Sequence, residues 1–393
     1  MTSLHLQRHG ARIQARGRSR IAMLCAALAV SACSPKQQVQ PPAGAPAVAA
    51  VTQQAGALLA AGYAGQFEAP PVSGPAATRG KTVWHISCGE AFSACSEMSK
   101  SFREAGELLG WKVSIVDGAA SPDTASSLIR QAIAAKVDAV SLVTFDCGGI
   151  KAGLLAAREA KMPVVQMGSY ECEGTPLFAA GVSLLGSADP DVFWRKWGAA
   201  RAEFLAARLG CEREVLSIEE SSQRAQQAVA RALSRRYSEV CPNGKLTPVP
   251  FTFAQVPGES TQIFSSALLA NPRAGALTWM PDALLGLGLE GAIKQNAPVG
   301  MLKAGAEGLA ANLEAMRGQV QDTIVYLPWD WIIWGLADTV NRVLAGENRA
   351  TLPSEGTGFM YIDREHNLPP RGQSVKLPVD FKGAYAKVWR GQP

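Results

Sequence analysis

The sequence has little of what metal sites and hydrolases require. Only four of its 393 residues are histidine, and two of these, His5 and His9, lie near the N-terminus. No two cysteines have the C-x2–4-C spacing of a structural zinc site. The G-x-S-x-G pattern of a nucleophile elbow is also absent. We therefore predict a protein without a metal, a cofactor or catalytic residues.

The formal net charge of +5 originates at one end of the chain. Residues 1–32 contain five arginines and no acidic residue. Removing these arginines from the total of 38 basic residues leaves 33 basic and 33 acidic residues in the remainder. A neutral remainder gives no electrostatic reason to expect nucleic-acid binding.

The N-terminus has the order of an export signal. A basic stretch ends at Arg20, and the apolar run Ile21–Val30 has ten residues, too few to cross a bilayer but suited to a signal-peptide core. Cys33 follows a small residue directly after this run, as in a lipobox. We predict a signal peptide over 1–32 and a membrane anchor formed by a lipid on Cys33. Ordinary cleavage after Ala32 is the alternative.

The other cysteines have even parity once Cys25 and Cys33 are set aside. The six that remain are Cys88, Cys95, Cys147, Cys172, Cys211 and Cys241. An even number suits three disulfides in an oxidising compartment, although six cysteines allow 15 pairings.

Residues 33–80 are rich in Pro, Ala, Gly and Gln. This composition predicts a flexible tether, within which Val51–Ala61 has the pattern of a short helix.

From residue 81 onward, strand and helix patterns alternate. The predicted strands are 82–87, 112–116, 137–143, 163–167, 214–218, 246–253, 274–279, 299–302 and 322–327. The predicted helices are 93–110, 121–136, 150–161, 190–209, 221–240, 260–270, 282–296, 309–318 and 329–344. Strands separated by helices favour parallel sheets with right-handed crossovers. The pattern occurs twice, so we predict an α/β fold of two Rossmann-like lobes with a cleft between them.

In such sheets ligands bind beyond the carboxyl ends of the strands. Carboxylates and amides can hydrogen-bond hydroxyl groups, and aromatic faces can cover the C–H side of a sugar ring. The candidate residues at these strand ends are Glu90, Phe92, Asp146, Glu171, Gln223, Phe253, Trp279 and Asp282.

Residues of about 81–350 resemble the type I periplasmic binding proteins of ribose and galactose importers. The stretches that carry this resemblance are Leu108–Gly118, Ile129–Val143, Ala157–Val165 and Thr278–Ala292. The resemblance implies ligand contacts from Cys88–Phe92, after the first strand, and from Asp146, after the third.

Three polar anchors of that family differ in this chain. Its Asn-Asp pair is replaced by Pro281-Asp282, its Gly-Phe-Asp-Gly segment by Lys303–Gly308, and its Gln-x-Pro by Tyr326-Leu327-Pro328. Tyr326 therefore joins the candidate ligand contacts. Extra aromatic residues in this region favour a ligand with more apolar surface, or one whose positive charge is held by a cation–π contact.

The resemblance also implies a hinge of three segments, near Cys172–Leu177, Leu327–Trp329 and Gly346–Leu352. The N-terminal lobe would then hold residues 81–173 and 328–347. The C-terminal lobe would hold 174–327 and 348–393.

The predicted topology suggests how the cysteines pair. Cys211 precedes a strand and Cys241 follows the next helix, so both lie at one end of a βα unit. The other four cysteines fall at the cleft end, where we predict the pairs Cys88–Cys95 and Cys147–Cys172.

Three functions remain open at this point. The first is the monomeric substrate-binding lipoprotein of an ABC importer in the cell envelope, which captures a sugar or another small polar ligand and delivers it to a permease. The second is a ligand-sensing lipoprotein that signals through a membrane receptor. The third, an enzyme on a similar scaffold, is disfavoured because no nucleophile–base pattern occurs.

Overall fold

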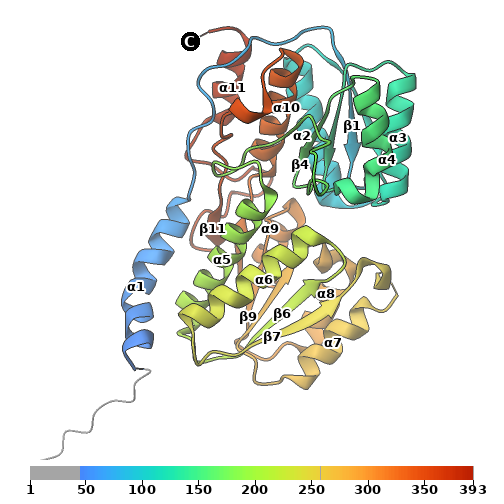
Figure 1. Ribbon diagram of the computed structural model, residues 1–393. Coiled ribbons are helices and arrows are strands. Elements are labelled where there is room, and N and C mark those ends of the chain that lie inside the picture. The colour runs from blue at the N-terminus through green and yellow to red at the C-terminus, as the bar shows by residue number, and fades with distance from the viewer. Residues whose placement is uncertain (1–44, 257, 393) are drawn as a thin grey trace, which may run out of the picture. The chain divides into compact units, whose positions relative to one another are not determined.

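The computed structural model describes residues 45–256 and 258–392. The predicted signal peptide over 1–32 and the lipidation at Cys33 lie outside these residues. Two mostly parallel sheets flanked by helices make up the two lobes, which confirms the predicted fold class (Figure 1).

The N-terminal lobe is built on a five-stranded parallel sheet with the order β2-β1-β3-β4-β5. Its strands are β1 (Thr82–Ser87), β2 (Lys112–Asp117), β3 (Ala139–Val143), β4 (Val164–Met167) and β5 (Ala180–Gly181). Its helices are α2 (Ser93–Leu108), α3 (Pro122–Ala134), α4 (Cys147–Glu159), α10 (Trp329–Leu344) and α11 (Phe381–Trp389).

Alternating side chains of this sheet enter two apolar layers. Val83 of β1 packs with α2 and α10, whereas Ile86 packs with α3 and α4. At the start of α3, Ser121 Oγ accepts a hydrogen bond from Thr124 N at 3.2 Å and Pro122 takes the first helical position. This register leaves the carboxyl ends of the strands on one edge of the lobe.

The C-terminal lobe has a six-stranded sheet with the order β11-β10-β9-β8-β6-β7. Its strands are β6 (Val215–Glu220), β7 (Leu246–Phe251), β8 (Ala276–Met280), β9 (Leu302–Gly305), β10 (Thr323–Tyr326) and β11 (Met360–Asp363). Its helices are α5 (Pro190–Leu209), α6 (Arg224–Val240), α7 (Ser260–Ala270), α8 (Leu289–Asn296) and α9 (Ala310–Arg317), with short 3-10 turns at η1 (Phe253–Gln255) and η2 (Asp282–Leu287). Only β11 is antiparallel to its neighbour among the pairs of this sheet.

The predicted helix over 282–296 is interrupted. Gly288 has a φ of +107°, and a Cβ there would lie 2.0 Å from Thr261 Oγ1, so a glycine is required where η2 ends and α8 begins.

The lobe boundaries differ from the prediction at two places. β5 pairs with β4, so the N-terminal lobe extends beyond residue 173. Residues 348–393 are divided: β11 joins the C-terminal sheet, but α11 packs on α10 through Trp334 and Trp389, whose rings stack 5.4 Å apart. The described chain therefore passes between the lobes at five segments, 65–81, 182–189, 327–329, 345–359 and 364–380, and not at three.

The tether expected over 33–80 is folded where the structure describes it. Residues Ala45–Ala64 form α1, which packs against α5 and β11, and the Tyr63 ring stacks on His366 at 4.0 Å. Farther on, Phe67 stacks on Trp331 at 5.6 Å and Arg342 donates to the backbone oxygen of Ser73 at 2.7 Å. The predicted tether is therefore wrong for these residues, because a composition rich in Pro and Ala does not reveal contacts with side chains far away in the sequence.

The three predicted disulfides, Cys88–Cys95, Cys147–Cys172 and Cys211–Cys241, are confirmed. The first two hold loops at the carboxyl edge of the N-terminal sheet. The third joins the two ends of the β6–α6 unit, from Cys211 before β6 to Cys241 after α6.

No helix within the described ranges is both long and apolar enough to cross a membrane.

Candidate functional site

Asp146 occupies the end of β3, where the fold predicts a ligand contact. Its Oδ1 accepts a hydrogen bond from the backbone N–H of Tyr170 at 2.9 Å. Burial raises the pKa of Asp146, while the N–H of Tyr170 and the guanidinium of Arg224 lower it in part. Oδ2 has no hydrogen-bond partner among the described residues, so it is available to a ligand.

Arg224 brings the other lobe to this point. It is the first residue of α6, and its guanidinium lies 4.0 Å from the centre of the Tyr170 ring. The Tyr170 hydroxyl donates to Asp191 at the start of α5, which fixes the ring. Asp146 and Tyr170 of the N-terminal lobe thus meet Arg224 of the C-terminal lobe.

Two aromatic residues also face one another across the lobes. Phe92 precedes α2 and Phe253 lies in η1, and their ring centres are 5.7 Å apart at an angle of 58°. Both rings are partly exposed. The two rings contact each other, and either can cover the C–H face of a small ring-shaped ligand beside them.

A buried charged group lies under the carboxyl ends of β8 and β9. Arg201 of α5 is 4% exposed and donates to Thr278 Oγ1 at 2.8 Å and to the backbone oxygen of Trp279 at 2.7 Å. Burial lowers the pKa of Arg201 to about 10, although Asp282, Glu307 and Glu219 act in the opposite direction. Burial, followed by the charge of Asp282, raises the pKa of Glu307 to about 8.

Two of the predicted ligand contacts are buried and have structural roles. Asp282 is 0% exposed, and its carboxylate accepts the backbone N–H groups of Ala306, Glu307 and Gly308 at 2.6–3.0 Å. Trp279 is also 0% exposed, because it belongs to the apolar layer under α7 and α8. The expectation that Asp282 and Trp279 touch the ligand is therefore corrected.

The clamp made by Asp282 shapes the loop beneath Tyr326. Gly308 has a φ of +83°, and a Cβ there would lie 2.5 Å from Tyr326 Cδ2. The loop can therefore pass under the ring only with a glycine at this position.

The remaining candidates are placed at the rim. Glu171 is engaged, since it accepts from Leu177 N at 3.0 Å and pairs with Arg349 at 3.3 Å. Glu90 accepts from Ser99 Oγ at 2.6 Å, and Gln223 is an exposed residue next to Arg224. Glu171 thus fastens a loop, whereas Glu90 and Gln223 are exposed residues that follow β1 and β6.

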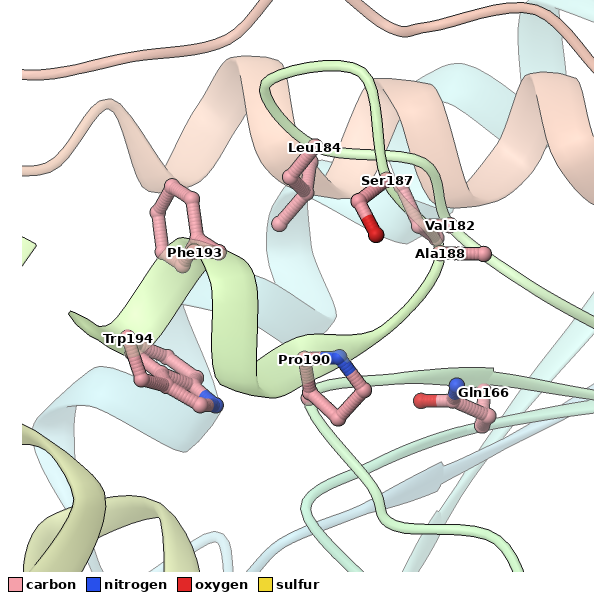
Figure 2. Close-up of a pocket in the computed structure, with 9 residues that line it drawn as sticks. Gln166, Val182, Leu184, Ser187, Ala188, Pro190, Phe193 and Trp194 are labelled. Carbon is pink, nitrogen blue, oxygen red and sulfur yellow. The ribbon is translucent and has the colours of Figure 1, made fainter. Parts of the chain in front are cut away.

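A cavity of about 490 Å³ is lined by residues of both lobes. From the N-terminal lobe, Glu97 lies on α2, and Trp329 and Asp330 begin α10. From the C-terminal lobe, Gly308 follows β9 and Tyr326 is the last residue of β10. This volume lies in the range of pockets that hold small molecules. By contrast, the void shown in Figure 2, between Gln166, Leu184, Phe193 and Trp194, measures about 10 Å³ and is too small for such a ligand.

The sequence prediction did not select several residues that the structure places in this region. Tyr170 and Arg224 follow β4 and β6 and could have been found by the strand-end rule, as could Glu307 after β9. Arg201 and Glu97 lie within helices, where no strand-end signal marks them.

Within the described residues, no three His, Cys, Asp or Glu side chains are grouped to hold a metal ion.

Residues 92–348 match the family model of the periplasmic binding protein domain. The chain belongs to the periplasmic binding protein family. This family consists of binding proteins that are not enzymes, which confirms the predicted binding role and the expectation that the chain is not an enzyme. The family also indicates a periplasmic or cell-envelope location.

Solved structures of periplasmic binding proteins share this fold at low sequence identity. The arabinose ABC transporter component of Shewanella sp. ANA-3, bound to arabinofuranose, is 18% identical with a TM-score of 0.62, covering 72% of this chain and 92% of that chain. A solute-binding protein of Actinobacillus succinogenes 130z with bound D-allose is 14% identical with a TM-score of 0.63, covering 72% and 98%.

The periplasmic ribose ABC transporter protein of Conexibacter woesei DSM 14684 is 17% identical with a TM-score of 0.61, covering 75% of this chain and 95% of that chain. A search of curated proteins found no relative by sequence. The predicted type I architecture is thus confirmed.

Proposed function

We propose that this protein is the substrate-binding component of an ABC importer. It captures a small polar ligand, a sugar or a sugar-like compound, between its lobes and delivers it to the permease. It acts as a monomer and is held at the membrane by a lipid on Cys33.

The cavity lined by both lobes is the observation that carries this proposal. Its volume of about 490 Å³ suits a small ligand, and it lies at the strand ends where ligands bind in this class of fold. The resemblance of the fold to proteins whose structures contain arabinofuranose or D-allose supports a sugar-like ligand.

Tyr326 lines this cavity, and other side chains at strand ends of the two lobes also suit a polyhydroxylated molecule. Asp146 Oδ2 can accept a hydroxyl proton, and the rings of Phe92, Phe253 and Tyr326 can pack on C–H faces. Arg224 already reaches the Tyr170 ring of the other lobe at 4.0 Å, so its guanidinium can donate to a ligand that Asp146 holds. Glu90 and Gln223 add polar groups at the rim.

Thermal unfolding of the chain from residue 34 with a panel of pentoses, hexoses, polyols and amino sugars tests the proposal. A ligand at ~100 times its dissociation constant adds about 2.7 kcal/mol to the free energy of unfolding. We expect at least one member of the panel to raise the melting temperature of the wild type and of Glu290→Gln, an exposed control on α8. The absence of any shift across the panel would contradict a binding role.

The anchor on Cys33 has a separate test. The full-length chain expressed in a bacterium should partition into detergent, and its N-terminal peptide should carry the mass of a lipid. Cys33→Ser should release the protein in soluble form. Finding unmodified Cys33 as the first residue after Ala32 in a soluble wild-type protein would support ordinary cleavage instead.

A further inference from the structure

Two carboxylates of the interlobe cavity have no ion-pair partner among the described residues. Glu97 lies in the first turns of α2 and Asp330 in the first turn of α10. Ser101 donates a hydrogen bond to Asp330. Glu314, which also lines the cavity, is different because it pairs with Arg317 at 2.7 Å and with Arg371 at 3.1 Å.

Arg317 also lines the cavity, but it pairs with Glu314 at 2.7 Å and with neither of these two carboxylates. Burial and the charge of Asp330 raise the pKa of Glu97, whereas Lys100 and the N–H of Ala310 lower it in part. Lys100 is exposed on α2, so water and salt screen its charge.

A further carboxyl lies next to the cavity. Glu307 is 5% exposed and accepts one hydrogen bond, from Asp282 N at 2.8 Å. The guanidinium that faces it, Arg201, also faces Asp282 and Glu219. Carboxyl groups therefore outnumber the buried cation at these strand ends, and Glu307, with its pKa raised to about 8, keeps its proton at neutral pH.

Unpartnered polar aromatic groups line the same cavity. Trp329 is 8% exposed, and its indole N–H has no hydrogen-bond partner. The hydroxyl of Tyr326 likewise has no partner among the described side-chain hydrogen bonds. The Tyr326 hydroxyl can donate to a ligand oxygen, and the rings of Tyr326 and Trp329 can lie against a cation. These groups point to a ligand independently of the carboxylates.

We propose that the ligand of this site carries a positive charge next to its hydroxyl groups, as in an amino sugar or a polyhydroxylated amine. The ammonium group would lie between Glu97 and Asp330, against Tyr326 and Trp329. This inference rests on the proposed function. A neutral ligand that closed the cleft would remove water from the carboxylates without replacing it by an opposite charge, which is costly.

Calorimetric titration with matched ligands tests this proposal. Glucosamine, galactosamine and mannosamine would each be compared with their N-acetyl derivatives and parent sugars, which lack the positive charge but keep the ring. We expect at least one amine to bind at least tenfold more tightly than both of its neutral counterparts. Glu97→Gln and Asp330→Asn should each reduce this preference about tenfold, whereas Glu290→Gln should leave it unchanged.

The outcomes separate the two levels of the proposal. If neutral sugars bind as tightly as the amines, the positively charged ligand is ruled out while the binding function stands. If no member of the set and no member of the wider panel binds, the proposed function itself fails. A preference for amines that persists in folded Glu97→Gln and Asp330→Asn would contradict the assigned position of the ammonium group.

Discussion

At the scale of single residues, Asp282 shows how a polar side chain at a strand end can belong to the fold. The strand-end rule selects it, but its two oxygens are used by three backbone N–H groups of residues 306–308. The rule locates a residue along the chain and cannot show which backbone donors lie nearby. Trp279 was misplaced for a related reason, since alternate residues of a strand face opposite layers.

Removing the Asp282 carboxylate should therefore lower stability more than it affects ligand contacts. Asp282→Asn replaces an acceptor oxygen by an N–H₂ group facing backbone donors, and we expect a loss of about 2–4 kcal/mol in the free energy of unfolding. Urea denaturation measures this, with the exposed Glu290→Gln as a control within about 0.5 kcal/mol of wild type. If Asp282→Asn is as stable as wild type but no longer binds ligand, Asp282 contacts the ligand and the structural role is wrong.

Glu307 should make stability depend on pH. Its pKa is raised from 4.5 to about 8, so between these values the folded state binds a proton that the unfolded state has lost. Unfolding then releases a proton, and this contribution to stability decreases as the pH rises from about 4.5 to 8. The charged groups that face Glu307 are Asp282, Arg201 and Glu97.

Glu307→Gln removes this titration. Its urea midpoint relative to wild type should therefore increase between pH 5 and pH 8. Measurements with Lys294→Gln provide a surface control, which should run parallel to wild type. Parallel curves for Glu307→Gln and wild type would mean that Glu307 titrates near its usual pKa.

At the scale of elements, prediction succeeded where the pattern was local. β1 was predicted with its observed bounds, Thr82–Ser87, because a short apolar run is bounded by turn residues. β5 has two residues and exists only through its pairing with β4, and β11 follows an irregular stretch. α1 lies in a segment whose composition is typical of linkers, and its packing on α5 and β11 depends on residues far away in the sequence.

The disulfides should contribute to stability in the order of the loops they close. Cys211 and Cys241 are 30 residues apart, whereas Cys88 and Cys95 are 7 residues apart. The chain-entropy relation predicts that the double serine variants lose about 3–4 and about 2 kcal/mol, respectively. Urea unfolding of both variants under oxidising conditions tests this order, which a larger loss in the variant of the shorter loop would contradict.

At the scale of the whole molecule, five chain segments between the lobes create a more extensive connection than the predicted three. One apolar cluster includes Phe193 of α5, Trp331 of α10 and Tyr361 of β11, so it continues from one lobe to the other. The site nevertheless draws on both lobes, with Asp146 and Phe92 on one and Arg224 and Phe253 on the other. Ligand capture therefore depends on residues that no single lobe supplies.

Calorimetric titration of the ligand that most raises the melting temperature tests this dependence most directly. We expect wild type to bind one ligand per chain, and Asp146→Asn and Arg224→Gln, one variant from each lobe, to bind it at least tenfold more weakly. Glu290→Gln should bind as wild type does. Unchanged affinity in both site variants, with their folding verified, would contradict a ligand held between Asp146 and Arg224.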